Sequence, residues 1–375
     1  MDKEQIKAVG LLSGGLDSTL AVRIMREQEI HVTALHFRTG FSYVERNRAL
    51  GRGEGGPSDA ERAAAMLGVD LQVIDVFDEY NPLVLQPRYG YGSGMNPCVD
   101  CRIFLLRQAK AWMEDHGYHF VFTGEVVGQR PKSQMRPSLN TVERESGLRG
   151  YLLRPLSAQL LEPTVPEQRG WVDRERLYGI SGRGRKAQIA LAERFGITDY
   201  AQPSGGCCYL IDQTYSRRLR DFLAREEPLV LSSAQVQLLA IGRHVRLPSG
   251  RKVVVGRYER ENELLETCGV AGVLLTTVDH PGPTTLVPGN PAREEIEQAA
   301  RITAGYSDGS GELVVRVEVR RDGGRNVGGR KQEAGDRGQE AGGGRQETGG
   351  RGQEAGGEVL TVEPMPREEI KSLMV

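Results

Sequence analysis

The sequence predicts an α/β protein with a parallel sheet, followed by a smaller domain of the α+β class. Three observations support this prediction. Short apolar runs at residues 7–12, 32–37, 71–77 and 120–124 alternate with helical patterns at residues 17–28, 58–67 and 103–116. Strands that alternate with helices pair in parallel, and the helices cover both faces of the sheet. A glycine turn joins the first strand to the first helix, and the pattern changes to strands with one long helix after about residue 229.

The chain divides into three predicted segments. Residues 1–150 hold the parallel sheet, residues 151–228 extend it with a second pair of cysteines, and residues 229–375 form the smaller domain. In the smaller domain we expect strands near 242–247, 252–256, 273–277 and 312–319 and a helix over 291–306. Residues 323–357 are a glycine-rich insertion in which QEA or QET recurs every seven residues. The repeat has no apolar seam for a coiled coil, so we expect it to be disordered.

Composition and charge narrow the class of protein. The chain of 375 residues carries 49 basic and 50 acidic residues, so any contact with RNA must come from local patches. No stretch approaches the length of a membrane span, and the apolar run near the N-terminus is too short for a secretion signal. Five cysteines in such a chain do not make a disulfide framework. We therefore expect a soluble, cytoplasmic protein.

Residues 13–18, with the sequence SGGLDS, have the features of a phosphate-binding loop. The two glycines let backbone N–H groups approach phosphate oxygens, and the positive end of the following helix points at the same place. The two serines add hydroxyl donors, and the aspartate is expected to hold Mg²⁺. Ligands of parallel sheets bind beyond the carboxyl ends of the strands, where three further residues lie. The predicted ATP site therefore contains Ser13, Gly14, Gly15, Asp17, Ser18, His36, Phe37 and Gly124.

The spacing S-G-G-x-D-S resembles the signature of the PP-loop ATP pyrophosphatases, whose fold is Rossmann-like. The resemblance implies cleavage of ATP between the α- and β-phosphates, with adenylation of a carbonyl-type oxygen. The loop lacks the Gly-Lys pair of a Walker A sequence, which argues against transfer of the γ-phosphoryl group. The superfamily includes asparagine, GMP and NAD synthetases and the tRNA thiolases, so the loop indicates the chemistry but not the substrate.

Four of the five cysteines form two groups, a C-x-x-C at Cys98 and Cys101 and a C-C pair at Cys207 and Cys208. Thiolates at positions i and i+3 near a helix start are close enough to bind one metal, and the helix terminus lowers their pKa. The grouping therefore indicates metal or sulfur chemistry. The fifth, Cys268, lies in an apolar stretch and is expected to fill space in a core.

The residues around the cysteines resemble the tRNA 2-thiouridylases. The segment N-P-C-x-x-C followed by Ile-Phe at 96–104, R-P-L at 154–156 and C-Y-L-I at 208–211 are similar to motifs of that family. Residues 7 to about 225 therefore resemble the tRNA thiolases, including the 4-thiouridine synthetases. Three features depart from the family: Arg102 replaces an asparagine, Glu125 replaces a histidine, and the loop at 128–135 has no counterpart.

Three interpretations of the cysteines stay open. The resemblance implies a [4Fe–4S] cluster held by Cys98, Cys101 and Cys208, with Cys207 as the alternative third ligand and one iron left to carry sulfide. A four-cysteine zinc site is disfavoured, because neighbouring cysteines point apart in extended backbone. In a metal-free alternative, Cys208 carries a persulfide and Cys98 or Cys101 is the nucleophile or resolving thiol. The predicted catalytic residues are Asp17, Cys98, Cys101 and Cys208.

Two basic segments are the predicted contacts with tRNA. The turn at 181–186 precedes a helix and suits phosphate contacts, although a solvated charged turn is the alternative. Residues 240–320 resemble the RNA-binding domain of the NFACT proteins in the segments GRKVVVGR at 250–257, ENEL at 261–264 and HPGPT at 280–284; a generic packing domain is the alternative. A third basic loop, 129–132, could touch ATP phosphates or RNA. The expected RNA-binding residues are Arg183, Arg185, Lys186, Arg251, Lys252, Arg257 and Asn262.

Together, these features predict a tRNA uridine thiolase that makes 2-thiouridine or 4-thiouridine from ATP and a sulfur donor. The donor would be a cysteine desulfurase, a relay protein or free sulfide. A PP-loop ligase or amidotransferase acting on a small molecule is one alternative, but it leaves both cysteine groups without a role. A non-catalytic RNA-binding protein is the other, and it leaves the intact SGGLDS loop without one.

Overall fold

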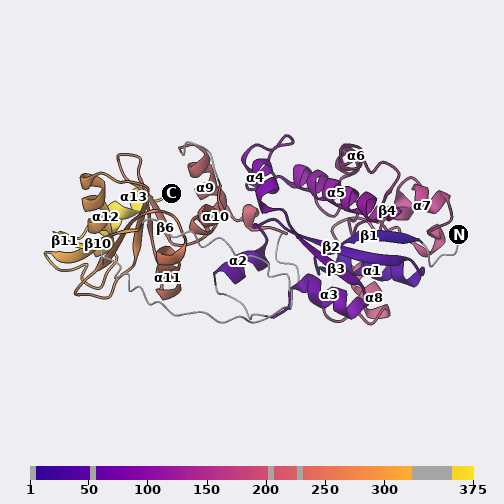
Figure 1. Ribbon diagram of the computed structural model, residues 1–375, viewed down its shortest axis with the longest axis horizontal. Helices are drawn as coiled ribbons and strands as arrows, with labels where there is room; N and C mark the ends of the chain where they lie inside the picture. The colour runs from indigo at the N-terminus through magenta and orange to yellow at the C-terminus, as the bar shows by residue number, and fades with distance from the viewer. Residues whose placement is uncertain (1–5, 51–55, 202–206, 226–230, 323–356) are drawn as a thin grey trace, which may run out of the picture. The chain divides into compact units, whose positions relative to one another are not determined.

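The computed structural model describes residues 6–50, 56–201, 207–225, 231–322 and 357–375. The chain forms two compact units, residues 1–226 and 227–375. Each unit has its own sheet (Figure 1). Each also has its own apolar core. Almost all of the predicted glycine-rich insertion, as well as Gly205 and Gly206 before the C-C pair, lies outside the described residues.

The first unit is built on a five-stranded sheet in the order β3-β2-β1-β4-β5. Every neighbouring pair of strands in it is parallel, which confirms the predicted parallel sheet. Because β1 is central, the loop that follows it lies at the middle of the carboxyl edge, where such sheets bind ligands. The strands are β1 (Lys7–Leu11), β2 (His31–Arg38), β3 (Asp70–Asp75), β4 (Phe120–Phe122) and β5 (Leu152–Leu153).

Helices cover both faces of this sheet. Successive residues of β1 point to opposite faces, so Ala8 joins the core under α1, α3 and α8, and Val9 joins the core under α5. Figure 1 shows these two layers on either side of the strands. None of the helices in the described parts of the chain is both long and apolar enough to cross a bilayer. The α-helices are α1 (Leu16–Glu27), α2 (Tyr43–Ala49), α3 (Asp59–Leu67), α4 (Phe77–Leu85), α5 (Cys98–Asp115), α6 (Arg136–Glu145), α7 (Val165–Gln168), α8 (Lys186–Arg194) and α9 (Gln213–Leu223), with short 3₁₀ turns η2 (Ala158–Leu160), η3 (Arg174–Arg176) and η4 (Tyr209–Ile211).

Local signals set several helix boundaries. Ser58 is the N-cap of α3 as predicted, and Ser58 and Glu61 form a capping box in which each side chain bonds the backbone of the other residue. The helix expected over 103–116 begins earlier, at Cys98, so both cysteines of the C-x-x-C lie in its first turn. The strand expected over 71–77 ends at Asp75, and Phe77 begins α4.

The second unit is an antiparallel sheet of six strands in the order β11-β10-β8-β9-β7-β6. Helix α12 packs on β8, β9, β10 and β11 and supplies much of the core, including Ile296, Ala299 and Ile302. This architecture confirms the predicted α+β class of the smaller domain. Its elements are α10 (Ser233–Ala240), β6 (Arg243–Arg246), β7 (Lys252–Val255), α11 (Glu259–Thr267), β8 (Gly272–Thr277), β9 (Thr285–Pro288), α12 (Arg293–Gly305), β10 (Val315–Asp322), β11 (Glu358–Val362) and α13 (Arg367–Ser372).

Candidate active site

The loop between β1 and α1 is held in shape by its own hydroxyl groups. The backbone N–H of Ser13 donates to the Ser18 hydroxyl at 3.3 Å, and that hydroxyl donates to the Gly15 carbonyl at 2.9 Å. Gly14 has φ +78°, and a Cβ there would overlap the backbone of Asp59. A side chain at this position is therefore excluded by both conformation and space. At Gly14 the backbone of the loop is therefore not covered by a side chain of its own.

Gly124, just after β4, lets the neighbouring chain approach the start of α1. A Cβ at Gly124 would overlap the backbone carbonyl of Asp17 and lie 2.5 Å from the Ser18 nitrogen. The predicted ATP-site residue Gly124 therefore acts through close packing against the loop.

We expect Gly124→Ala to destabilise the first unit by about 1–3 kcal/mol, because the added methyl group forces α1 away from β4. Gly184→Ala is the matched control, since a Cβ there meets nothing within 4 Å. Urea unfolding followed by tryptophan fluorescence measures the difference, and equal midpoints for the two variants would contradict this packing role.

Asp17 occupies the first turn of α1 and is surrounded by cationic and amide groups. Its Oδ2 accepts a hydrogen bond from Gln129 Nε2 at 3.1 Å and lies 3.9 Å from a terminal nitrogen of Arg185. Its Oδ1 is buried and has no hydrogen-bond partner among the described residues. Burial raises the pKa of Asp17, while Arg185, Gln129 and Arg130 lower it. A carboxylate with one oxygen left over fits a magnesium ion that also takes phosphate oxygens and waters.

The two predicted residues at the end of β2 have packing and bracing contacts. A ring nitrogen of His36 lies 3.0 Å from the Leu12 carbonyl, which ties β2 to the start of the loop. Phe37 packs against the core on the α5 side of the sheet. Their contact with a nucleotide stays a prediction.

Hydrogen bonds join the two cysteine segments, which are about a hundred residues apart in sequence. The backbone N–H of Met95 donates to the Leu210 carbonyl at 2.8 Å. The Ser216 hydroxyl donates to the same carbonyl at 2.9 Å and lies 3.2 Å from the Met95 nitrogen. A Cβ at Gly94 would overlap the Leu210 carbonyl, so the glycine permits this approach. The fold therefore brings the C-x-x-C of α5 next to the C-C pair.

The two thiols of α5 are largely shielded from solvent. Asn96 Nδ2 donates a hydrogen bond to Cys98 Sγ at 2.9 Å, although burial still raises the pKa of Cys98. Burial raises the pKa of Cys101 to about 12, even though a hydrogen bond with Tyr80 lowers it. Cys101 is therefore a neutral thiol at physiological pH until a charge or a ligand changes its surroundings.

The C-C pair shares one hydrogen bond, which separates the two pKa values. The Cys208 thiol donates to the Cys207 sulfur, and this bond, with Arg130 and Arg102 nearby, lowers the pKa of Cys207. The same bond raises the pKa of Cys208, because it depends on the Cys208 proton. Cys207 is exposed and Cys208 is half-buried. The more acidic thiol is thus Cys207, whereas the sequence resemblance favoured Cys208 as the catalytic residue.

All four thiols are free. Within the described residues, no group of three or more histidine, cysteine or acidic side chains is close enough to hold a metal ion. The expected [4Fe–4S] ligands Cys98, Cys101 and Cys208, with Cys207 as alternative, therefore do not fit a cluster in this arrangement. Cys268 is buried in the second unit, as expected of a residue that fills space in a core.

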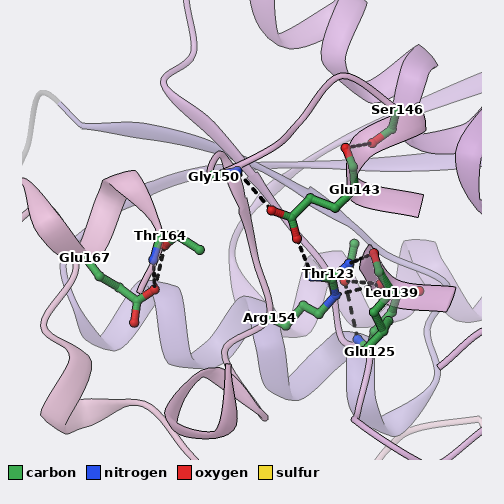
Figure 2. A network of polar contacts seen from close by, with 9 residues as sticks. All are labelled: Thr123, Glu125, Leu139, Glu143, Ser146, Gly150, Arg154, Thr164 and Glu167. Carbon is green, nitrogen blue, oxygen red and sulfur yellow. Dashed lines mark hydrogen bonds and ion pairs between the residues drawn. The ribbon is translucent and has the colours of Figure 1, made fainter. Parts of the chain in front are cut away.

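The two residues that depart from the thiouridylase pattern are partners in space. Arg102 Nε lies 3.4 Å from Glu125 Oε1, and Arg154 Nε lies 3.1 Å from Glu125 Oε2. Arg154 also contacts Glu143 at 3.0 Å, and Glu143 accepts from the Gly150 nitrogen at 2.9 Å (Figure 2). Arg102 follows Cys98 by four residues on α5, so the two share a helix face. The network therefore anchors a guanidinium group beside the thiols.

Two families match the chain. Residues 6–167 match the family described as the tRNA methyl transferase HUP domain, and residues 242–333 match the NFACT protein RNA binding domain. The chain joins a HUP domain to an NFACT RNA-binding domain. These matches confirm the two resemblances seen in the sequence, the first over the loop and the C-x-x-C and the second over the smaller domain.

The relatives of the HUP domain include tRNA-specific 2-thiouridylases. That of Petrotoga mobilis is 30% identical over 227 residues, which are 57% of this chain and 58% of the relative. That of Roseiflexus sp. is 26% identical over 256 residues, 64% of this chain and 68% of the relative. The chain thus spans about 58% of the length of the first relative. A solved 4-thiouridine synthetase–RNA complex with bound ATP is 20% identical, covers 50% of each chain and has a TM-score of 0.31, too low to bear on function.

Several predicted RNA contacts of the NFACT domain have structural partners. Arg257 Nε donates to Glu261 at 2.9 Å, and Arg251 Nε lies 3.1 Å from Glu295. Asn262 Oδ1 accepts from the Thr284 nitrogen at 3.0 Å. The fourth residue of this set, Lys252, is 6% exposed. These interactions give Arg251, Arg257 and Asn262 a role in the fold, and the contact of all four residues with RNA stays a prediction.

The three RNA-binding residues predicted in the first unit differ in their surroundings. Arg183 and Lys186 are exposed, and their contact with RNA stays a prediction. Arg185 instead turns toward Asp17 of the loop. Sequence reasoning also missed the partnership of Arg102 with Glu125. The sequence did contain a signal for this pair: Arg102 and Glu125 carry opposite charges, and both replace residues that are usual in the thiouridylases.

Proposed function

We propose that the chain is an ATP-dependent tRNA sulfurtransferase that makes 2-thiouridine or 4-thiouridine. A HUP domain and an RNA-binding domain on one chain support this proposal. The observation that carries it is the hydrogen-bonded junction of the two cysteine segments through Met95, Leu210 and Ser216. Arg130 lowers the pKa of Asp17 and also those of Cys98 and Cys207, so one side chain borders the nucleotide loop and the thiols.

The first step of the proposed reaction is adenylation of the base. ATP lies on residues 13–18, where the serine hydroxyls, the backbone of the loop and the N-terminus of α1 bind the phosphates. The uridine carbonyl oxygen attacks the α-phosphorus, a new O–P bond forms, and pyrophosphate leaves. Asp17 would hold Mg²⁺, which supplies neutralisation of phosphate charge when bound. Placing the oxygen and the α-phosphorus in line supplies much of the rate.

The second step replaces oxygen by sulfur. The terminal sulfur of a persulfide on Cys208 attacks the adenylated carbon, and AMP leaves with the original oxygen. The Cys98 or Cys101 thiol then loses its proton to water and attacks the Cys208 sulfur, which breaks the S–S bond, leaves sulfur on the base and joins the two cysteines as a disulfide. An external dithiol returns two electrons and two protons, and the sulfur donor reloads Cys208. No step is assigned to an iron–sulfur cluster, since the described thiols do not fit one.

The proposed partners are tRNA and a donor of sulfane sulfur or sulfide, such as a cysteine desulfurase or a relay protein. Uridines modified in tRNA lie in loops or must leave a stack, so the base is splayed out toward the thiols. Arg183 and Lys186, exposed at the start of α8, are the proposed phosphate contacts in the HUP unit.

The products of ATP test the adenylation step. With bulk tRNA and a sulfur donor present, we expect AMP and pyrophosphate in equal amounts and no ADP. Omission of tRNA should reduce AMP formation to background, because the acceptor oxygen is then missing. AMP formation that depends on an added small carboxylic acid or amine instead of tRNA would indicate a ligase of small molecules.

A further inference from the structure

Buried polar atoms that have no hydrogen-bond partner concentrate around Asp17. Among the described residues, five such side-chain atoms belong to four neighbouring residues of this cluster. A buried donor or acceptor without a partner costs about 1–3 kcal/mol, so such atoms are few in folded proteins and indicate a ligand, an ion or water. The atoms are Asp17 Oδ1, Gln129 Oε1, Arg185 Nε, and Nε2 and Oε1 of Gln188.

These side chains come from three segments, of which two form arms over the loop at 13–18. One arm is the turn at residues 128–130, which contributes Gln129, and the other is the start of α8, which contributes Arg185 and Gln188. Gln188 is fully buried and lowers the pKa of Asp17, which shows that it faces the carboxylate. Both arms therefore converge on the same carboxylate at the N-terminus of α1.

The two arms are fastened to each other. Val127 and Ser181 form a parallel bridge, and the Gly182 nitrogen donates to the Val127 carbonyl at 2.8 Å. The buried Ser157 hydroxyl accepts from the Val127 nitrogen at 3.0 Å and donates to the Ile180 carbonyl at 2.7 Å. Because the two arms are fixed to each other at their bases, the side chains of Gln129 and Arg185 are held near Asp17.

The contact between Arg185 and Asp17 is longer than a hydrogen bond. The 3.9 Å separation leaves the guanidinium attracted to the carboxylate but not bonded to it, and its Nε has no partner. A guanidinium binds two phosphate oxygens with a fork of N–H groups, which a carboxylate at this distance does not use. A phosphate bound to the loop would accept hydrogen bonds from the N–H groups of the guanidinium. A cation bound to Asp17 would then neutralise the carboxylate in place of Arg185.

We propose that Arg185 is a pyrophosphate-binding residue of the nucleotide site and that Gln129 is a positioning residue that orients Asp17 for the metal ion. Arg185 moves from Asp17 to the β- and γ-phosphates when the magnesium nucleotide binds. This inference rests on the proposed function and assigns Arg185 to the nucleotide, whereas its place in a basic turn had suggested RNA.

The test measures binding of pyrophosphate and of a non-hydrolysable ATP analogue to the full chain by calorimetry, with and without Mg²⁺ and without tRNA. Arg185→Ala should weaken both ligands about ten- to a hundredfold, the loss expected for a hydrogen bond to a charged group. Arg185→Lys keeps the positive charge but loses the fork of N–H groups. Its affinity for both ligands should therefore lie between that of Arg185→Ala and that of the unsubstituted chain. Gln129→Ala should reduce the gain in affinity that Mg²⁺ provides and leave binding without Mg²⁺ unchanged.

Arg183→Ala is the matched control, because Arg183 lies in the same basic turn but is exposed. It should bind pyrophosphate as the unsubstituted chain does. Affinity of each variant for bulk tRNA is measured in parallel by filter binding, and Arg185→Ala should change it less than twofold. Unchanged pyrophosphate binding by Arg185→Ala together with lost tRNA binding would overturn this inference and leave the proposed function intact. Failure of the unsubstituted chain to bind any nucleotide would overturn both.

Discussion

Replacement of Arg154 by alanine is expected to destabilise the first unit by about 3–5 kcal/mol, because it removes the buried cation that pairs with both Glu125 and Glu143. Arg154 is 3% exposed and bridges Glu125 and Glu143 (Figure 2). Urea unfolding followed by tryptophan fluorescence measures the loss. Trp112 and Trp171 are the two tryptophans of the chain and both lie in the first unit, so the signal reports on that unit.

Arg88→Ala is the control for this prediction. Arg88 also pairs with a glutamate, Glu145, at 3.2 Å, but its side chain is 71% exposed. Pairs of this kind contribute about 0–1 kcal/mol. A midpoint for Arg154→Ala within error of that for Arg88→Ala would show that the network does not stabilise the fold.

Cys208→Ala is expected to reduce thiolation by about a thousandfold or more, because the sulfur that attacks the base is carried on this residue. The loop at 13–18 is untouched, so up to one pyrophosphate per chain should still form with tRNA, while the AMP group stays bonded to the base. Asp17→Asn should instead abolish pyrophosphate formation together with thiolation. The difference between the two variants separates sulfur transfer from adenylation, and both products are measured in the same quenched reaction.

Two further cysteine variants serve as comparisons. Cys268→Ala removes a thiol from the second unit and should leave thiolation unchanged. Cys207→Ala removes the more acidic thiol of the C-C pair and should retain activity if Cys208 carries the sulfur. An active Cys208→Ala enzyme with an inactive Cys207→Ala enzyme would move the sulfur-carrying role to Cys207.

Most of the first unit could be predicted because its strands are buried and its turns have strong local signals. The apolar runs gave β1 and β2, and Ser58 with Glu61 marked the start of α3. The start of α5 could not be predicted, because its N-cap residue is Pro97, which makes no side-chain capping hydrogen bond. Strand β9, which was also missed, has only four residues and a proline at its end. Short strands of this kind are defined by their neighbours in the sheet.

The position of the loop at 13–18 between a strand and a helix could be predicted from the sequence, whereas the surroundings of the thiols could not. The loop is a contiguous segment in which each residue type has a local reason. The junction of Met95 with Leu210, the Arg102–Glu125 pair and the approach of Arg185 to Asp17 depend on segments that are distant in sequence. The residue types at 181–186 identified a basic turn that contains Arg185, but only the fold shows that Arg185 faces a carboxylate.

Nucleoside mass spectrometry tests most directly whether the chain uses ATP to put sulfur on a uridine of tRNA. The chain is incubated with ATP, Mg²⁺, a sulfur donor, a dithiol and bulk tRNA lacking thiolated uridines, and the tRNA is digested to nucleosides. We expect 2-thiouridine or 4-thiouridine to appear with the unsubstituted chain and to be absent with Cys208→Ala and Asp17→Asn. If no thiolated uridine forms while the same preparation binds ATP and tRNA, the account is contradicted.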